Sequence, residues 1–233
     1  MRKISDEGLR AAYIKQFNLP ALLPIDVLNM PLYEFNQEEI LCQQGEPLHY
    51  VFLLVKGKVR IYSTSSEGKR LIVAFNAPLE LFGDIELVQN MDLLNTVEAV
   101  GTVHAFALSI PLLRQRMQEN IGLLQYLLNV VTRKFCTKST TLSFHLLNEV
   151  DVRFASYLLS ITHDEYRRMQ TDTIAKSELK EIAEFIGTST RHQNRIINDF
   201  IDKGIIGRVK NGIVIKDTTT LMKKAQGNIY EMQ

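Results

Sequence analysis

The chain has 233 residues, of which 45% are hydrophobic and 23% charged, and its net charge is +1. These values are ordinary for a globular protein with a real core, and they exclude a long disordered or low-complexity chain. No window approaches the roughly 20 apolar residues of a membrane span, and Met1–Glu7 has no signal-peptide run, so we expect a cytoplasmic protein without a membrane partner. Balanced charge does not point to nucleic acid, although a local basic face is enough to bind phosphates.

Residues 1 to about 30 predict short helical pieces, interrupted by Pro20, Pro24 and Pro31. From Leu32 to Leu108, short apolar runs alternate with turn residues every 8 to 12 positions or so, the spacing of an antiparallel sandwich or barrel. The expected strands are 32–35, 40–42, 50–55, 58–62, 71–75, 96–100 and 103–108.

The two cysteines, Cys42 and Cys136, lie far apart in the sequence. We expect each to be a small buried hydrophobe rather than a redox residue. Two thiolates cannot supply the four that an iron–sulfur cluster usually needs, but a cluster shared between subunits or a thiol partner stays open.

Pro111 begins a long helical pattern, since proline suits the first turn of a helix. Apolar residues then recur at steps of three and four, as they do along a coiled-coil seam. A single helix packed on its own sheet would give the same pattern, but its length favours a partner helix. We therefore predict a homodimer. The predicted dimerisation residues are Leu113, Met117, Ile121, Leu124, Leu128, Val131 and Phe135.

Residues 177–186 predict a helix that Ser177 caps and Gly187 ends. Its buried face would consist of Leu179, Ile182, Ala183 and Ile186. A second helix follows from Thr190 to about Lys203. Two short helices joined by a glycine turn form either a generic helical corner or a helix-turn-helix.

The segment after the second helix favours the helix-turn-helix. Residues 205–210 and 213–215 predict two strands, and Asn211-Gly212 between them is the strongest two-residue hairpin signal. A helix-turn-helix followed by a hairpin is a winged helix. Arg208 and Lys210 on this hairpin suit phosphate contact, although charge on an edge strand is also common.

The outer face of the second helix carries side chains that suit base edges in a DNA major groove. Arginine can bridge two guanine acceptors and asparagine can pair with adenine, while hydroxyls at a helix N-terminus suit a phosphate oxygen. We expect Asn198 and Lys203 to face the DNA backbone or solvent. The predicted DNA contacts are Thr188, Ser189, Thr190, Arg191, His192, Asn194, Arg195, Arg208 and Lys210.

The order of these parts resembles the Crp/Fnr family of bacterial regulators over nearly the whole chain. Three segments carry the resemblance: Gly45-Glu46 with 50–59 looks like the family's β-roll signature, 82–87 resembles its nucleotide-binding cassette, and 183–204 matches its helix-turn-helix, including Gly187, Ser189 and Arg195. Within the family, 84–87 and Arg191-His192 are similar to the YeiL-type subgroup.

The resemblance implies an α+β protein that binds double-stranded DNA, and RNA polymerase as well if it is an activator. Its domains would be a sensory β-roll at 1–110, a dimerisation helix and linker at 111–147, and a winged helix-turn-helix at 148–233. The operator should differ from the founding member's, because Thr190-Arg191 stands where the family commonly has Arg-Glu.

The cassette departs from the cyclic-nucleotide-binding members. Asp84 stands at their Glu position, and their phosphate-binding Arg-Ser pair falls on Leu94 and Asn95. Leucine cannot donate the charge-assisted bonds that a buried phosphodiester needs, so cyclic AMP is not expected and the effector stays unidentified. A haem ligand and the oxygen-sensing cysteine cluster are also missing, since His104 is a lone histidine expected in the core or at the surface. The effector pocket, if it exists, would be lined by Phe82, Gly83, Asp84, Ile85, Leu94 and Asn95.

Two other functions were weighed. A cupin-like enzyme would gather histidines around a metal, but only His49 and His104 fall in the strand region and no His-x-His occurs, so we expect neither a metal nor catalysis. A nucleotide-type ligand-binding module that acts through protein partners would lack the winged helix and would retain the phosphate ligands. We therefore expect a transcription regulator without an identified cofactor.

Overall fold

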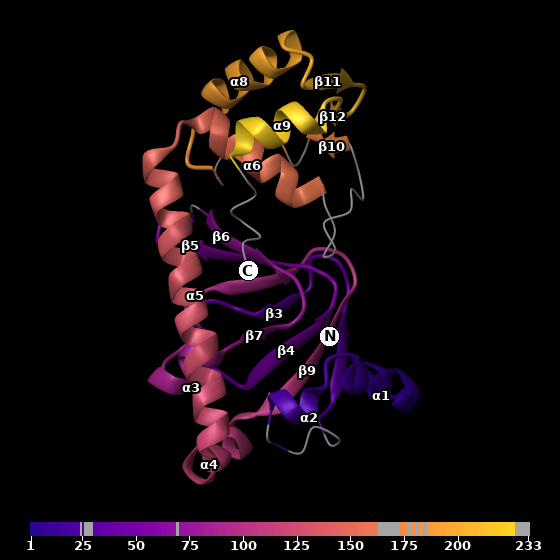
Figure 1. The fold of residues 1–233 in the computed structure, drawn as a ribbon, viewed down its shortest axis with the longest axis vertical. Coiled ribbons are helices and arrows are strands. Elements are labelled where there is room, and N and C mark those ends of the chain that lie inside the picture. Colours follow the sequence, from indigo (N-terminus) through magenta and orange to yellow (C-terminus); the bar gives the residue numbers. More distant parts are fainter. Residues whose placement is uncertain are drawn as a thin grey trace. The chain divides into compact units, whose positions relative to one another are not determined.

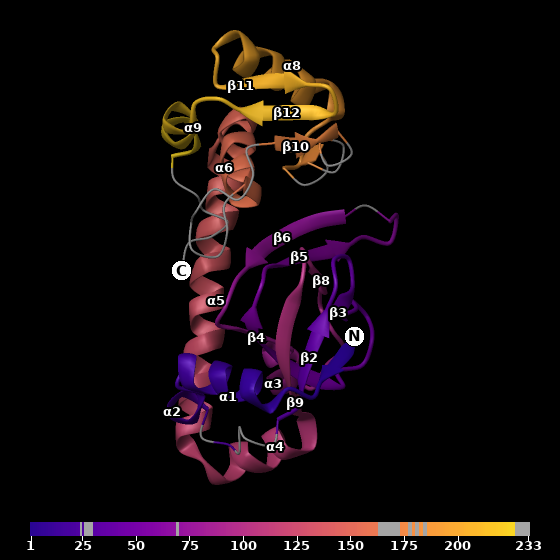
Figure 2. The same cartoon turned by 90° about the vertical axis from the view of Figure 1, so that its right-hand side faces the viewer.

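The computed structural model describes residues 1–23, 25, 30–68, 70–162, 173–176, 179, 182–183 and 186–226. They form two compact units, shown in Figures 1 and 2: Met1–Ser63 with Asn76–Cys136, and Thr64–Phe75 with Thr137–Gln233. Helices and antiparallel sheets occur in both, so the predicted α+β class is confirmed. None of the described helices is long and apolar enough to cross a membrane.

Two antiparallel sheets build the β-roll. The first has the strand order β1-β2-β9-β4-β7 and the second the order β3-β8-β5-β6. All seven strands expected from the sequence are present, whereas β1 and β7, of three residues each, were not predicted. The strands are β1 Arg2–Ile4, β2 Leu32–Phe35, β3 Ile40–Cys42, β4 Tyr50–Lys56, β5 Val59–Thr64, β6 Arg70–Asn76, β7 Glu80–Phe82, β8 Thr96–Ala99 and β9 Val103–Ser109.

The position of strand β4 between two apolar clusters explains why its sequence is apolar without alternation. Side chains on opposite faces of a strand alternate along it. Leu53 contributes to a cluster that contains the helices, whereas Phe52 and Leu54 contribute to a second cluster with Phe35 and Val97. Because both faces of β4 are covered, every residue from position 51 to 55 is buried.

Among the described residues, five helices belong to the roll or begin there. The helix α1 begins at Asp6, whose carboxylate accepts the N–H of Leu9 at 2.9 Å. The first half of α5 runs along the side of the roll in both views (Figures 1 and 2). The helices are α1 Glu7–Gln16, α2 Leu19–Leu22, α3 Asp84–Gln89, α4 Ile110–Glu119 and α5 Ile121–Leu147.

The long helix predicted from Pro111 is two helices. Asn120 separates α4 from α5 in an extended conformation, with φ −132° and ψ 101°. Its side-chain oxygen accepts the N–H of Leu123 at 3.1 Å, which supplies a cap for α5. The prediction of one continuous helix was therefore wrong at Asn120.

This break corrects the predicted seam. Leu113 is 1% exposed and Met117 is partly buried, and both pack into the roll's own core from α4, so neither can belong to an exposed stripe. On α5 the face turned to the core consists of Leu123, Leu127 and Val130. The remaining predicted positions do lie outside that face. Ile121 is 75% exposed, Leu124 42%, Leu128 66% and Phe135 71%, and Val131 is partly exposed.

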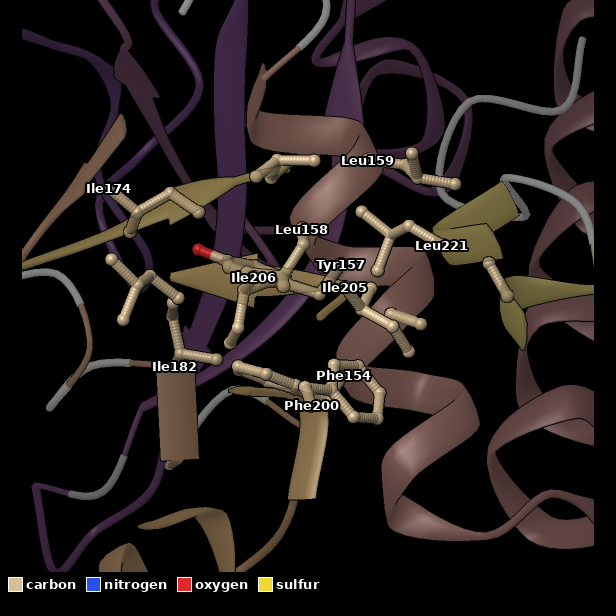
Figure 3. Close-up of a cluster of buried hydrophobic side chains, with 14 of the residues drawn as sticks. Phe154, Tyr157, Leu158, Leu159, Ile174, Ile182, Phe200, Ile205, Ile206 and Leu221 are labelled. Carbon is tan, nitrogen blue, oxygen red and sulfur yellow. The ribbon is translucent and has the colours of Figure 1, made fainter. Parts of the chain in front are cut away.

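The second unit has its own core, drawn in Figure 3. Phe154 and Leu158 of α6, Phe200 of α8, Ile206 of β11 and Leu221 of α9 meet there, each at most 1% exposed. Its strands after residue 137 form one sheet in the order β10-β12-β11, among the described residues. The elements are α6 Val150–Thr162, β10 Thr173–Ala175, α8 Thr190–Asp202, β11 Ile206–Val209, β12 Gly212–Ile215 and α9 Thr218–Ala225.

Candidate nucleic-acid interface

The turn that leads into α8 is built as the sequence predicts. Gly187 has φ +65°, a conformation that glycine adopts at little cost. The hydroxyl of Ser189 accepts the N–H of His192 at 3.2 Å and so caps α8. Arg153 of α6 donates to the carbonyl of Ile186, which fixes the turn on the helix behind it.

The helix predicted before this turn is described in part. Ile182, Ala183 and Ile186 are buried and Leu179 packs against the core, as expected. Ser177, the predicted cap, lies outside the described residues. All four residues of the predicted buried face are described, and their burial agrees with the prediction.

One face of α8 packs against the core of the second unit. Ile196, Ile197 and Phe200 are at most 7% exposed, and the rings of Phe200 and Phe154 are 5.7 Å apart between centroids. Gln193 is also buried, at 1% exposure, which explains why it has no place among the outward side chains. The opposite face of α8 is left open to solvent.

That open face carries the side chains singled out from the sequence. Thr190, Arg191, His192, Asn194 and Arg195 are all exposed. Among the described residues, neither the Arg191 nor the Arg195 guanidinium has a hydrogen bond or ion pair. Ser189 is exposed and Thr188 partly exposed at the same end of the helix. Both guanidinium groups are thus available to an external acceptor.

The hairpin after α8 differs from its prediction by one position. Val209 pairs with Gly212, so the two-residue loop is Lys210-Asn211 and Gly212 is already in β12. The third strand explains this shift. β10 pairs with β12, and a Cβ atom at Gly212 would overlap the carbonyl of Ile174. Glycine is needed here for close approach of two strands rather than for a turn.

The hairpin and α8 are joined by a hydrogen bond. Arg208 Nη2 of β11 donates to Asn198 Oδ1 of α8 at 2.7 Å. Sequence reasoning placed Asn198 toward a DNA backbone or solvent and gave no signal of this contact. Lys210 is exposed in the loop. Lys203, at the end of α8, is bonded to Asp199 at 2.7 Å, and this bond raises the pKa of Lys203.

The electrostatics of this face favour a polyanion. The first turn of α8 has no acidic residue, and its positive dipole end faces the same side as Thr188 and Ser189. Arg191, Arg195 and Lys210 add positive charge. A helix of this composition can place forked donors on base edges while the hairpin and the cap bind phosphates.

The predicted effector segment lies in the other unit, around α3. Phe82 ends β7, Gly83 precedes α3 with φ +90°, and Asp84 is its first residue, 2% exposed. Leu94 is 39% exposed and its N–H donates to Glu86 Oε1 at 3.0 Å. Ile85 and Asn95 are partly exposed. Four of these positions therefore lie at the start of α3, and Leu94 and Asn95 lie in the loop that follows it. The helix α3 itself was not predicted from the sequence.

His104 is buried among polar partners, and the two cysteines differ in exposure. His104 is 5% exposed, its Nδ1 is 2.9 Å from the Tyr13 hydroxyl, and its Nε2 is 3.4 Å from Glu34 Oε2. Burial lowers the pKa of His104, Lys56 lowers it further, and Glu34 opposes the shift. Cys42 is buried as expected, whereas Cys136 is exposed, contrary to prediction. Within the described part of the chain, no three histidine, cysteine or acidic residues form a group that could hold a metal.

Comparison with known proteins agrees with this geometry. A cyclic nucleotide-binding domain model matches residues 32–120, and a Crp-like helix-turn-helix domain model matches residues 152–224. The regulatory protein YeiL of Escherichia coli O157:H7 is 27% identical over 195 residues, which are 82% of this chain and 83% of that protein.

Two further relatives span almost the whole chain. The CRP-like cAMP-activated global transcriptional regulator of Mycobacterium tuberculosis is 22% identical over 226 residues, 95% of this chain and 100% of that protein. A crystal structure of a crp/fnr-family regulator from Eubacterium rectale has the same fold, with a TM-score of 0.77 at 16% identity, and it covers 93% of this chain and 100% of its own. With both domain models in sequence order and full-length relatives of one kind, the chain belongs to the Crp/Fnr family of DNA-binding transcription regulators.

Proposed function

We propose that the protein is a cytoplasmic homodimer that recognises a near-palindromic DNA sequence. Each α8 enters the major groove of one half-site, and the two half-sites lie about 34 Å apart, one turn of the duplex. The β11–β12 hairpin contacts the adjacent phosphates through Arg208 and Lys210. Where the protein activates transcription, RNA polymerase is its protein partner.

The observation that carries this proposal is the unpaired state of Arg191 and Arg195. Both side chains are exposed, and none of the described residues pairs with either guanidinium. Forked donors that point outward from the first turns of a capped helix suit guanine N7 and O6. The Asn198–Arg208 bond supports the proposal, because it holds the hairpin at a fixed position beside that helix.

The exposed stripe of α5 supports the homodimer. Ile121, Leu128 and Phe135 are at least 66% exposed and follow one another at seven-residue intervals, with Leu124 between the first two. A heptad spacing of large apolar residues on one helix is satisfied by the same stripe of a second copy. The neighbouring stripe, with Leu123 and Leu127, is already covered by the roll.

We also propose that the roll does not bind cyclic AMP and that the protein has neither a cofactor nor a catalytic activity. The Mycobacterium tuberculosis relative is named as cAMP-activated, but this chain has Leu94 and Asn95 where a cyclic phosphate needs forked donors. Titration calorimetry with cyclic AMP and cyclic GMP tests this point directly. Micromolar binding of either nucleotide would refute it.

The DNA proposal is tested by selecting an operator from random fragments and comparing Arg195→Ala with Arg116→Ala. Arg116 is the control, because it is a partly exposed arginine paired with Glu119 on α4 of the roll. Losing a base contact should weaken operator binding by about 1–3 kcal/mol, or roughly 5- to 150-fold. The control should bind like the wild type, and both variants should sediment as dimers. Wild-type affinity in Arg195→Ala, or equal losses in both variants, would count against the proposed reading helix.

The alternative, a ligand-binding module that acts through proteins, predicts a different salt dependence. Phosphate contacts release counterions, so the logarithm of DNA affinity should fall steeply and linearly with the logarithm of salt concentration. A flat salt response would favour the alternative.

A further inference from the structure

Lys134 of α5 is inserted into the β7–α3 segment. Its Nζ lies 2.7 Å from Asp84 Oδ1, also donates to the carbonyl of Leu81, and is 5.7 Å from the centre of the Phe82 ring. The Lys134 side chain is 15% exposed and that of Asp84 only 2%. A lysine on a helical stripe is normally solvated, so this position was not predicted from the sequence.

The charges around this contact are predominantly negative. Glu80 Oε2 lies 3.3 Å from Arg133 Nη2, and Glu80 Oε1 lies 3.6 Å from Lys134. Glu86 is buried and its carboxylate accepts a backbone N–H. Asp84 Oδ2 is buried without a hydrogen-bond partner among the described residues. In the part of the chain that the structure describes, Glu80 and Asp84 therefore share two cations while Glu86 has none, and Lys134 is the cation that reaches Asp84, the most buried of the three carboxylates.

The pair has a large energetic consequence because Asp84 is so deeply buried. An ionised carboxylate inside a protein is costly unless a cation compensates it, and removing one partner of a buried pair leaves the other uncompensated. The compensating charge comes from α5, 50 residues away in the sequence. The first half of α5 is thus held to β7 and α3 by the Lys134–Asp84 ion pair as well as by the packing of Leu123 and Leu127.

We propose that Lys134 is a built-in cation that completes the β7–α3 segment, so that α5 is held against the roll without any diffusible effector and DNA binding is constitutive. An anionic ligand entering here would meet Glu80, Asp84 and Glu86, and a cationic ligand would have to displace Lys134. The DNA readout of this inference rests on the proposed function, but the coupling between Lys134 and Asp84 does not.

The test compares Lys134→Met, Asp84→Asn, the double variant and the control Lys15→Met in the full-length protein. Lys15 is an exposed lysine on α1, so its substitution measures the loss of a surface charge alone. Two properties are measured: the thermal midpoint, and hydrogen exchange of α5 amides between residues 121 and 136.

Lys134→Met should lower the thermal midpoint by about 5 °C or more and accelerate exchange in this part of α5, since it strands a buried carboxylate. Adding Asp84→Asn should restore most of both losses, because a neutral amide needs no cation. Lys15→Met should resemble the wild type. The inference fails if Lys134→Met behaves like Lys15→Met, or if the double variant is no better than Lys134→Met alone.

The DNA arm uses wild-type protein unfolded in denaturant, dialysed free of small molecules and refolded. It should bind its selected operator with unchanged affinity, and Lys134→Met should bind at least about tenfold more weakly at the same temperature. If refolded wild type binds DNA only after cell extract of small-molecule size is added, constitutive binding is refuted. If no sample binds any DNA, the proposed function fails. The thermal midpoint and hydrogen exchange then still test the coupling between Lys134 and Asp84.

Discussion

Replacing Leu128 by alanine should separate dimerisation from folding. Leu128 is 66% exposed on the outer stripe of α5, whereas its neighbour Leu127 is 3% exposed and buried in the roll's core. Full burial of a leucine side chain contributes about 1.5–3 kcal/mol. About two thirds of that remains available at position 128, and a symmetric dimer contains the residue twice, so Leu128→Ala should weaken the dimer by about 2–4 kcal/mol.

That loss corresponds to a roughly 30- to 1,000-fold higher dimer dissociation constant, measured by sedimentation equilibrium. Leu127→Ala is the matched comparison one residue away. It should lower the free energy of unfolding by about 2–5 kcal/mol, because it leaves a cavity in the core. The reasoning is refuted if Leu128→Ala sediments like the wild type, or if Leu127→Ala dissociates the dimer as strongly while folding normally.

Three further predictions concern stability and reactivity. Burial lowers the pKa of His104, so the unfolded chain takes up a proton at a higher pH than the folded protein does. The contribution of His104 to the free energy of unfolding should therefore be constant above about pH 6.5, where an unfolded histidine titrates. It should fall as the pH drops from there toward the pKa of the folded state. Urea unfolding from pH 8 to 5 checks this, and an identical slope in His104→Asn would contradict it. Gly212→Ala should cost more than about 2 kcal/mol and abolish operator binding, because its Cβ meets the Ile174 carbonyl, whereas Gly45→Ala, with φ +81° and open space around it, should cost about 1–2 kcal/mol by chemical denaturation. The Cys42 thiol, whose pKa burial raises to about 12, should resist a thiol reagent at pH 8 that labels exposed Cys136; equal labelling rates would disprove this.

Most of the roll and the reading helix could be predicted because their signals are local. The strands β2 to β6, β8 and β9 alternate or are bounded by turn residues, and the face of α8 follows from the spacing of Ile196, Ile197 and Phe200. The three-residue strands β1, β7 and β10 are short and partly polar, unlike the apolar run Ile40–Cys42 of β3, and pairing with distant partners stabilises them. The six-residue helix α3 is too short for the same reason.

The seam could be predicted only in part, for two physical reasons. Successive leucines at 123–124 and 127–128 give α5 two adjacent apolar stripes, and spacing cannot tell which stripe the roll covers. Leu113 and Met117 continue the spacing across Asn120 by coincidence, although an asparagine just before Ile121 was a readable cap signal. Lys134 and Asn198 could not be assigned, because their partners are fixed by tertiary packing.

The cap at Asn120 sets the rotational phase of α5. Each residue turns an α-helix by about 100°, so deleting one residue just after Asn120 would bring the second leucine of each pair to where the first now lies. Such a chain could still cover the roll with leucines, yet it would present a different stripe to a neighbouring copy and move Lys134 away from Asp84. Single-residue changes in length at this joint would therefore alter assembly far more than substitutions on the helix surface.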